Sequence, residues 1–378
     1  YIKSMRTQII TAIILLLIVL LNISDNITIE ENIINTITII LTISWALAVY
    51  LMWDLGKTQK RKINLEKDER EYLTIIAKKT WNYFKECMIN YLPADNYQED
   101  RKEKYEPRTS PTNIGLAMMS TIASYDLKFE NKINTIRLLS NMIDTILKLP
   151  KWNGHLYNWY NIKTLEPIIP YDISSVDSGN FIGYLYTVRE FLEEQTKTKD
   201  IEQLITNIDN IIEETDFSKL YDYKAGLFSI GFNCEQNKLY DSYYDLLASE
   251  ARQTSLIAIA KKDVEAKHWN NLGRTLTSLR EHKGLLSWGG TAFEYLMPNI
   301  NIPTYQSTLI DESCKLLVMS DKEYAKKLNI PWGMSESAYS LKDFYGNYQY
   351  KTFGIPWLGL KRGLSEDAVV SPYSTALA

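Results

Sequence analysis

Two apolar runs open the chain. Residues 9–23 are an almost unbroken apolar run, and residues 33–53 form a second run about as long as a bilayer core requires. An acidic segment, residues 24–32, lies between them, and basic side chains lie outside both ends of the pair: Lys3, Arg6, Lys57, Lys60, Arg61 and Lys62. This pattern predicts a transmembrane hairpin within residues 1–62 whose two ends lie in the cytoplasm. A cleaved signal peptide is disfavoured, because there are two runs and a basic stop pattern.

From residue 63 onward the apolar positions recur every three to four residues, which predicts a mainly α-helical domain over residues 63–378. The expected helices cover residues 65–90, 112–125, 132–149, 178–196, 201–214, 242–262, 268–281 and 308–328. Strand patterns are short, as in residues 227–232. Paired helices joined by loops rich in Trp, Tyr, Gly and Asn favour an (α/α)6 barrel with its loops gathered at one open end. The helices are fewer than six hairpins require, and the chain ends within a helical pattern, so we expect truncation near the C-terminus.

A glutamate stands within the apolar stripe of the expected helix 242–262. Glu250 follows Leu246 by four positions and precedes Ile257 by seven, so the three share one helical face. Burial at such a position raises the pKa of a carboxyl group, as a general acid near neutral pH requires. The alternative is a core glutamate that Arg252 or a buried tyrosine satisfies.

Glu336, in the string PWGMSESAY at residues 331–339, is a second candidate for a catalytic carboxylate. The proline, tryptophan and glycine before it indicate an ordered loop that delivers the side chain to a site. The alternative is a glutamate at the start of a helix, close to a serine cap. Two carboxylates among aromatic residues suit glycoside chemistry, in which one protonates the leaving oxygen and the other attacks the sugar or activates water. Other acids compete for these roles: Asp177, Asp241, Asp245, Glu294 and Glu235.

Composition excludes several classes of function. The net charge of −4 gives no sign of the excess of basic residues that binds nucleic acid. The three cysteines (Cys87, Cys234, Cys314) are scattered and form no C-x-x-C pair, which fits a reducing compartment and argues against a zinc site. The three histidines form no cluster, and no phosphate-binding glycine motif is present. We therefore expect no metal and no cofactor.

Six strings carry a resemblance to a known family: YLPADNYQ (91–98), TSPTNIGL (109–116), KWNGHLYNWY (151–160), DSYYDLLASEAR (241–252), PWGMSESAY (331–339) and GLKRGL (359–364). In this order they resemble the glycoamylase-like cyclisation domain of bacterial cyclic β-1,2-glucan synthases, from about residue 65 to residue 378. The resemblance implies a retaining transglycosylase that cuts a linear β-1,2-glucan and closes it into a ring. Glu250 matches the family's acid/base and Glu336 its nucleophile.

The resemblance also implies a setting. Such synthases are bacterial inner-membrane enzymes, and the two apolar runs match the last spans of a glycosyltransferase region that makes the linear glucan. The catalytic domain would lie on the cytoplasmic side. The glycosyltransferase core and a C-terminal phosphorylase module of the same polypeptide are absent from these residues. The lipid bilayer and the glucan chain are therefore the expected partners.

Further residues are candidates for sugar contacts. Four aromatic rings suit stacking on glucose units: Trp288, Trp159, Tyr339 and Tyr243. Four polar side chains suit hydrogen bonds to sugar hydroxyls or orientation of the glutamates: His155, Asp177, Arg252 and Glu294. Core packing or loop backbone contacts are the alternative for each. Two rival functions remain open, an endo-β-1,2-glucanase hydrolase on the same fold and a non-catalytic glucan-binding module.

Overall fold

The computed structural model describes residues 6–21, 29–55, 64–344, 346 and 348–378. It divides the chain into two compact units, Tyr1–Ile63 and Asn64–Ala378, here called unit 1 and unit 2. The predicted basic residues Lys3, Lys57, Lys60, Arg61 and Lys62, and part of the acidic segment 24–32, lie outside the described residues.

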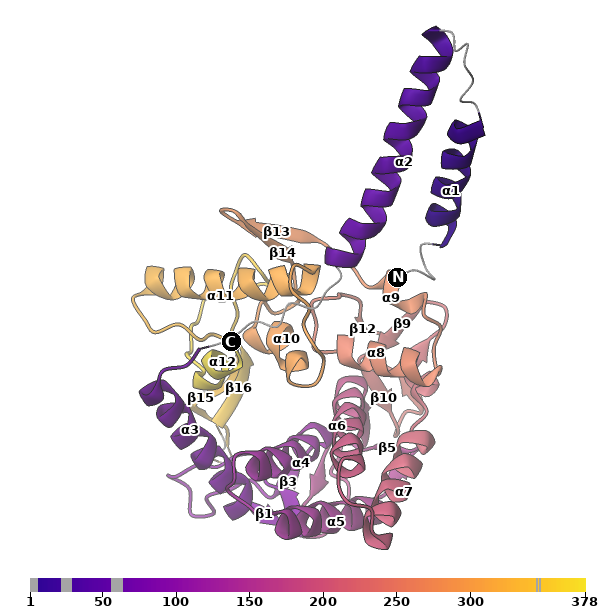
Figure 1. The fold of residues 1–378 in the computed structure, drawn as a ribbon. Helices are drawn as coiled ribbons and strands as arrows, with labels where there is room; N and C mark the ends of the chain where they lie inside the picture. Colours follow the sequence, from indigo (N-terminus) through magenta and orange to yellow (C-terminus); the bar gives the residue numbers. More distant parts are fainter. Residues whose placement is uncertain (1–5, 22–28, 56–63, 345, 347) are drawn as a thin grey trace. The chain divides into compact units, whose positions relative to one another are not determined.

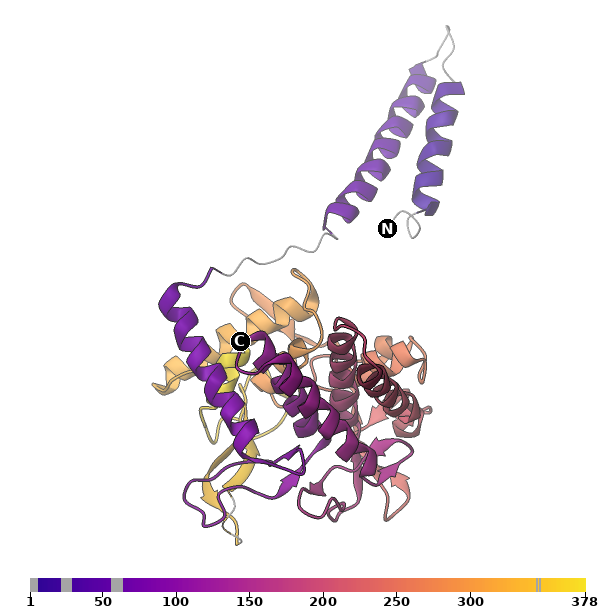
Figure 2. The same ribbon diagram turned by 60° about the horizontal axis from the view of Figure 1, so that its bottom comes forward.

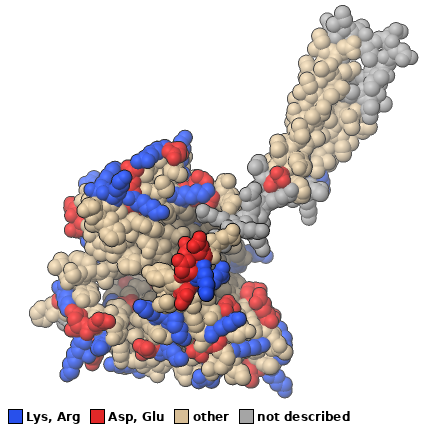
Figure 3. Space-filling view, turned by 60° about the vertical axis from the view of Figure 1, so that its left-hand side comes forward, with Lys and Arg blue, Asp and Glu red and all other residues tan. Residues whose placement is uncertain are grey.

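Unit 1 consists of two helices packed side by side, α1 (Arg6–Leu21) and α2 (Ile29–Leu55) (Figure 1). Their isoleucine and leucine side chains are largely exposed, as at Ile37, Ile40 and Leu47. Within α2, the stretch Asn32–Asp54 is long and apolar enough to cross a membrane, whereas the apolar part of α1, Arg6–Ile18, is shorter. Figure 3 shows a nearly uncharged surface along the described part of this unit, while basic and acidic side chains are interspersed over the visible face of unit 2.

Unit 2 is built from helices in two sets. The inner set is α4 (Pro111–Asp126), α6 (Ser175–Glu193), α8 (Arg252–Lys261), α10 (Ala292–Leu296) and α12 (Pro372–Leu377). The outer set is α3 (Lys67–Glu86), α5 (Lys132–Lys148), α7 (Lys199–Glu214), α9 (His268–Asn271) and α11 (Leu309–Leu328). Along the chain outer and inner helices alternate, and α4 packs on α6, α6 on α8 and α10 on α12 (Figures 1 and 2). The predicted mainly helical, paired architecture is therefore present.

Side-chain caps set where the inner helices begin. Ser110, Ser174 and Thr291 each accept a hydrogen bond from the backbone three residues on, which satisfies free N–H groups at the starts of α4, α6 and α10. The starts also lie together. The Oγ1 atom of Thr254, near the start of α8, donates to the carbonyl of Ser175 at 3.0 Å. Asn180 of α6 also lies 3.1 Å from Thr112 of α4, so the beginnings of α4, α6 and α8 gather at one end of unit 2.

Two glycines bring α6 and α8 into close contact. A Cβ atom on Gly179 would lie 2.0 Å from Oγ1 of Thr254, and one on Gly183 would lie 2.6 Å from Nε2 of Gln253. At Gly179 the Cα atom of Thr254 would also lie only 2.6 Å away, so a larger side chain is excluded there, whereas at Gly183 the nearest atoms are ends of flexible side chains that can shift. The small residues let the two helices approach until polar side chains of α6 reach the residues that precede α8.

The strands form short antiparallel ladders in the loops. The two-stranded ladders pair β1 (Met88–Ile89) with β2 (Leu92–Pro93), β3 (Arg108–Thr109) with β6 (Tyr160–Asn161), β4 (Lys151–Trp152) with β5 (His155–Leu156), β13 (Leu276–Leu279) with β14 (His282–Leu285) and β15 (Glu336–Lys342) with β16 (Tyr348–Thr352). Two three-stranded sheets have the orders β11 (Lys238–Leu239), β10 (Gly231–Asn233), β7 (Asp172–Ser174) and β12 (Tyr243–Tyr244), β9 (Leu227–Ser229), β8 (Tyr221–Asp222). Two 3-10 turns, η1 (Phe217–Leu220) and η2 (Met297–Ile300), complete the elements.

Two of the predicted helices are wrong in extent. The helix expected from residue 242 begins only at Arg252, because Tyr243 and Tyr244 pair with β9 as strand β12. Leu246 and Leu247 are buried where the backbone forms a β-bridge to Gly273, and they do not lie on the face of a helix. The helix expected over residues 268–281 stops at Asn271, and a β-hairpin follows. In both places tertiary strand pairing overrides the helical spacing of apolar residues.

Candidate active site

Glu250 lies two residues before α8, at the crowded end of the inner helices, and not on a helical stripe as predicted. The Nδ2 atom of Asn180 on α6 donates to Oε1 of Glu250 at 2.5 Å and lies 3.1 Å from Oγ1 of Thr112 at the start of α4. The residue keeps partial solvent access, but protein surrounds its carboxyl group. Burial first, and then the charge of Asp177, raise the pKa of Glu250 well above its usual value. The environment therefore favours the protonated form of Glu250.

Glu336 is the first residue of β15. The hydroxyl of Tyr350 on β16 donates to Oε2 of Glu336 at 2.6 Å. The strand register pairs Ala338 with Tyr350, so Tyr350 stands diagonally opposite Glu336 on the same face. Burial raises the pKa of Glu336, whereas the hydrogen bond from Tyr350 and the positive charge of Lys361 act against that rise. Glu336 thus has two influences that stabilise its ionised form.

The backbone around Glu336 is held by neighbouring helices. The Oγ atom of Ser335 accepts from the backbone N–H of Phe293 on α10 at 3.0 Å. The hydroxyl of Tyr373 on α12 lies 2.7 Å from that Oγ and 2.8 Å from the carbonyl oxygen of Glu336. One residue earlier, the carboxylate of Asp321 on α11 accepts from the N–H of Met334 at 3.1 Å. The start of β15 is therefore fixed to α10, α11 and α12.

The two glutamates share one electrostatic environment. The charges of Glu336 and Glu294 both raise the pKa of Glu250, although less than burial and Asp177 do. Burial and then the charges of Glu250, Asp177 and Glu336 also raise the pKa of Tyr244. Glycoside chemistry uses one protonated carboxyl group as the acid and one carboxylate as the nucleophile. A hydrogen bond that stabilises the carboxylate helps to keep the two roles apart.

Three of the predicted polar site residues are occupied by protein contacts. Glu294 forms the capping box of α10 with Thr291, and its carboxylate also accepts from Oγ of Ser287 at 2.8 Å. The buried guanidinium of Arg252 donates to Asn299 and to carbonyl oxygens of Ser249, Glu294 and Tyr295. His155 is buried, with its ring nitrogens 3.0 Å from Oγ of Ser178 and 2.9 Å from the carbonyl of Asp216. Their contacts are those of structural residues.

Asp177 lies in the first turn of α6, where its N–H is bound to the cap Ser174 and its charge reaches Glu250. Asn180 lies one turn further on the same helix. The charge of Asp177 therefore acts on Glu250, and its role at the site stays a prediction.

The four predicted aromatic residues differ in solvent exposure and in their contacts with the protein. Trp288 has 48% of its surface exposed, and its Nε1 donates to Oδ1 of Asp245 at 2.7 Å. The guanidinium carbon of Arg108 lies 4.3 Å from the ring centre of Trp159. The hydroxyls of the two tyrosines are bound to protein: Tyr339 to Gln349 at 2.9 Å and Tyr243 to Asp222 at 2.6 Å. Trp288 is the candidate with the most accessible ring.

Sequence reasoning missed four residues that contact or surround the glutamates: Asn180, Tyr244, Tyr350 and Tyr373. Asn180 had a local signal, because it is a buried polar residue within an apolar helix. The sequence around Tyr350 and Tyr373 contains no such signal, since only strand pairing and helix packing bring these residues to Glu336.

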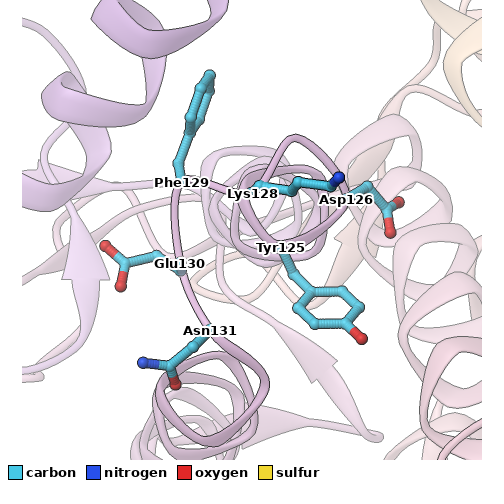
Figure 4. A pocket seen from close by; sticks show the side chains of 6 residues that line it. All are labelled: Tyr125, Asp126, Lys128, Phe129, Glu130 and Asn131. Carbon is cyan, nitrogen blue, oxygen red and sulfur yellow. The ribbon is translucent and has the colours of Figure 1, made fainter.

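Neither Glu250 nor Glu336 lines either of two surface cavities. One, of about 530 Å³, is lined by the turn between α4 and α5, where Tyr125 and Glu130 lie (Figure 4). The other, of about 510 Å³, is lined by α6 from Gly183 to Glu190, by α8 from Gln253 to Ala260 and by residues 301–303. The first cavity lies at the C-terminal end of α4, whereas the second reaches Gln253, three residues after Glu250. Within the described part of the chain, no group of three or more His, Cys, Asp or Glu side chains is arranged to hold a metal ion.

Comparison with known proteins points to one family. No protein-family model matches the chain. The chain is 30% identical to the cyclic β-(1,2)-glucan synthase NdvB of Rhizobium meliloti (strain 1021), over 462 aligned residues that include 88% of this chain. The resemblance to cyclic β-1,2-glucan synthases is confirmed. The chain spans only 16% of the length of that synthase.

Solved structures agree on the fold of unit 2. An endo-β-1,2-glucanase from Chitinophaga pinensis matches with a TM-score of 0.63 and 15% identity, covering 79% of this chain and 76% of that one. An endo-β-1,2-glucanase from Talaromyces funiculosus matches with a TM-score of 0.66 and 14% identity, covering 81% and 72%. At these identities the likeness shows a shared fold.

Proposed function

We propose that unit 2 is a retaining transglycosylase that closes linear β-1,2-glucan into rings, as one part of a larger membrane-bound synthase. The observation that carries the proposal is the unequal setting of the two glutamates. Glu250 has a strongly raised pKa, while Glu336 accepts a hydrogen bond from Tyr350 at 2.6 Å. The similarity to a cyclic β-1,2-glucan synthase supports the substrate class.

The reaction runs in two displacements at one anomeric carbon. Glu336 attacks C1 of a glucose unit and forms a glucosyl-enzyme, while Glu250 gives its proton to the oxygen of the leaving glucan. Glu250, now ionised, then takes the proton of the 2-hydroxyl at the far end of the bound chain. That oxygen attacks C1, Glu336 departs, and a ring is released with its configuration retained. Water has to be excluded while the glucosyl-enzyme exists.

Two finer parts of the architecture belong to this proposal. We assign α1 and α2 to a transmembrane hairpin with its ends in the cytoplasm, supported by the exposed apolar side chains of both helices. Unit 2 would be an (α/α)6 barrel, supported by the alternation of outer and inner helices and by the likeness to solved glucanases.

The fold likeness to endo-β-1,2-glucanases favours one alternative, a hydrolase that passes the glucosyl unit to water. The decisive experiment incubates the full chain with linear β-1,2-glucan, digests the products with an exo-acting β-glucosidase and weighs what resists. Resistant species, lighter by one water than linear chains of the same number of glucose units, support ring closure. Digestible fragments with new reducing ends indicate the hydrolase. Binding without turnover by a folded protein indicates a glucan-binding module.

A further inference from the structure

We propose that Tyr350 is a positioning residue that holds Glu336 ionised and correctly rotated for attack. The proposal rests on the proposed function, because it takes Glu336 as the nucleophile. Of the two carboxylate oxygens, Oε2 accepts the bond from Tyr350, and we assign the attack on C1 to Oε1. The tyrosine keeps its proton throughout and makes no bond to the sugar.

Strand pairing fixes this geometry. Glu336 and Ala338 on β15 face Thr352 and Tyr350 on β16, and alternation along each strand places all four side chains on one face of the hairpin. The backbone at Glu336 is anchored separately by Tyr373 and Ser335. One tyrosine therefore holds the main chain while the other holds the carboxylate.

Glu336 needs such a donor. It lies in a partly buried site, and the negative charge of Glu294 further disfavours its ionised form. A hydrogen bond to a carboxylate stabilises the charged state and is stronger than one between neutral groups. Burial and the neighbouring charge of Glu336 raise the pKa of Tyr350, so that its hydroxyl stays protonated and remains a donor.

The side chain of Tyr350 adds little to packing. Its surface is 65% exposed, and only the hydroxyl end lies against Glu336. Loss of the hydroxyl therefore leaves the strand ladder and the hydrophobic core in place. This makes a functional test possible with little effect on folding.

The test compares two tyrosines of the same strand. Tyr350→Phe removes the hydroxyl bound to Glu336. Tyr348→Phe is the matched control, because Tyr348 stands two residues away on the same face and its hydroxyl is bound to Asp100. Both variants are made in the full chain, and kcat and KM on linear β-1,2-glucan are measured from pH 4 to 9.

For Tyr350→Phe we expect kcat to fall by roughly 10- to 100-fold while KM stays within about twofold. The acid limb of the pH profile moves upward by about one pH unit, because Glu336 without its donor ionises less readily. Tyr348→Phe changes neither. An unshifted acid limb in Tyr350→Phe, or an equal loss in the control, overturns the proposal.

Two further measurements separate the possible failures. Glu336→Gln is assayed in parallel. If it is inactive while Tyr350→Phe behaves as wild type, only the role of Tyr350 fails, and if it stays active, the proposed function fails as well. Should Tyr350→Phe unfold, 3,5-difluorotyrosine at position 350 is used instead. It donates a stronger hydrogen bond, so the acid limb should move to lower pH, and no movement overturns the proposal.

Discussion

The amide of Asn180 and the carboxyl of Glu250 are joined by a hydrogen bond of 2.5 Å that links α6 to the chain entering α8. Asp177 lies one turn earlier on α6 and acts on the same carboxyl group. The two side chains have opposite effects, because the amide donor favours the ionised form of Glu250 and the negative charge of Asp177 disfavours it.

Substitutions at these two positions should shift the pH profile in opposite directions. Asp177→Asn removes a charge that raises the pKa of Glu250, so the basic limb of kcat/KM should move to lower pH by about one unit. Asn180→Ala removes a donor that lowers this pKa, so the basic limb should move to higher pH. Rate measurements from pH 5 to 10 test both. Glu190→Gln, a charge loss at the far end of α6, is the control, and shifts of the same sign in both variants contradict the assignment.

Removal of the nucleophile should be rescued by a small anion. Glu336→Gly should lower ring formation roughly a thousandfold or more. Sodium azide then occupies the freed space and attacks C1 from the same side, which gives a glucan with a terminal α-glucosyl azide. The anomeric configuration is read by NMR. A β-azide from this variant would place Glu336 in the acid/base role. Glu265→Gln, an exposed glutamate paired with Lys267, should behave as wild type.

His155 should make stability fall as the solution is acidified. Burial lowers its pKa to about 4 from the ordinary 6.5, although the hydrogen bond to Asp216 acts in the other direction. Between these two pH values the unfolded chain binds a proton that the folded chain does not. The free energy of unfolding should therefore decrease as pH falls from 6.5 to 4, by up to about 3 kcal/mol from this group.

Urea unfolding at several pH values checks this. His155→Gln should flatten the pH dependence between pH 4 and 6.5. His282→Gln, at a position with more solvent access, should leave it unchanged. Equal slopes for wild type and His155→Gln would show that other groups carry the acid sensitivity.

Unit 1 should anchor the protein to membranes. After alkaline carbonate extraction, we expect the wild type to remain in the membrane pellet. Arginines in place of Ile37 and Ile40 should release it, since each costs roughly 3 kcal/mol near the centre of a span. Ile133→Arg is the control, because Ile133 is 79% exposed on α5 of unit 2. Wild type in the soluble fraction would contradict the span.

The sequence predicted the helical architecture because amphipathic spacing survives in helices that pack on one side, as in α5 and α7. It failed at residues 242–251, where the same spacing arises from a strand and a bridge to Gly273. Glu250 and Glu336 were selected from the residue pattern around each of them, and only the assignment of their two roles came from the resemblance to a family. The reason given for the burial of Glu250 was wrong, since α6 and not an apolar helical stripe surrounds it. The contact between Tyr350 and Glu336 could not be predicted from the sequence, because it depends on the register of a hairpin.

The two glutamates are carried by parts of the chain that differ in their tolerance of change. Glu250 is tied to the crossing of α6 and α8, where even a methyl group on Gly179 would collide. Glu336 is carried by the β15–β16 hairpin, whose far end is open to solvent, with Leu341 60% and Phe344 97% exposed. Insertions and exchanges at that end leave the helical core untouched. For protein engineering, the surroundings of Glu250 therefore tolerate little change, whereas the hairpin that carries Glu336 offers exposed positions for redesign.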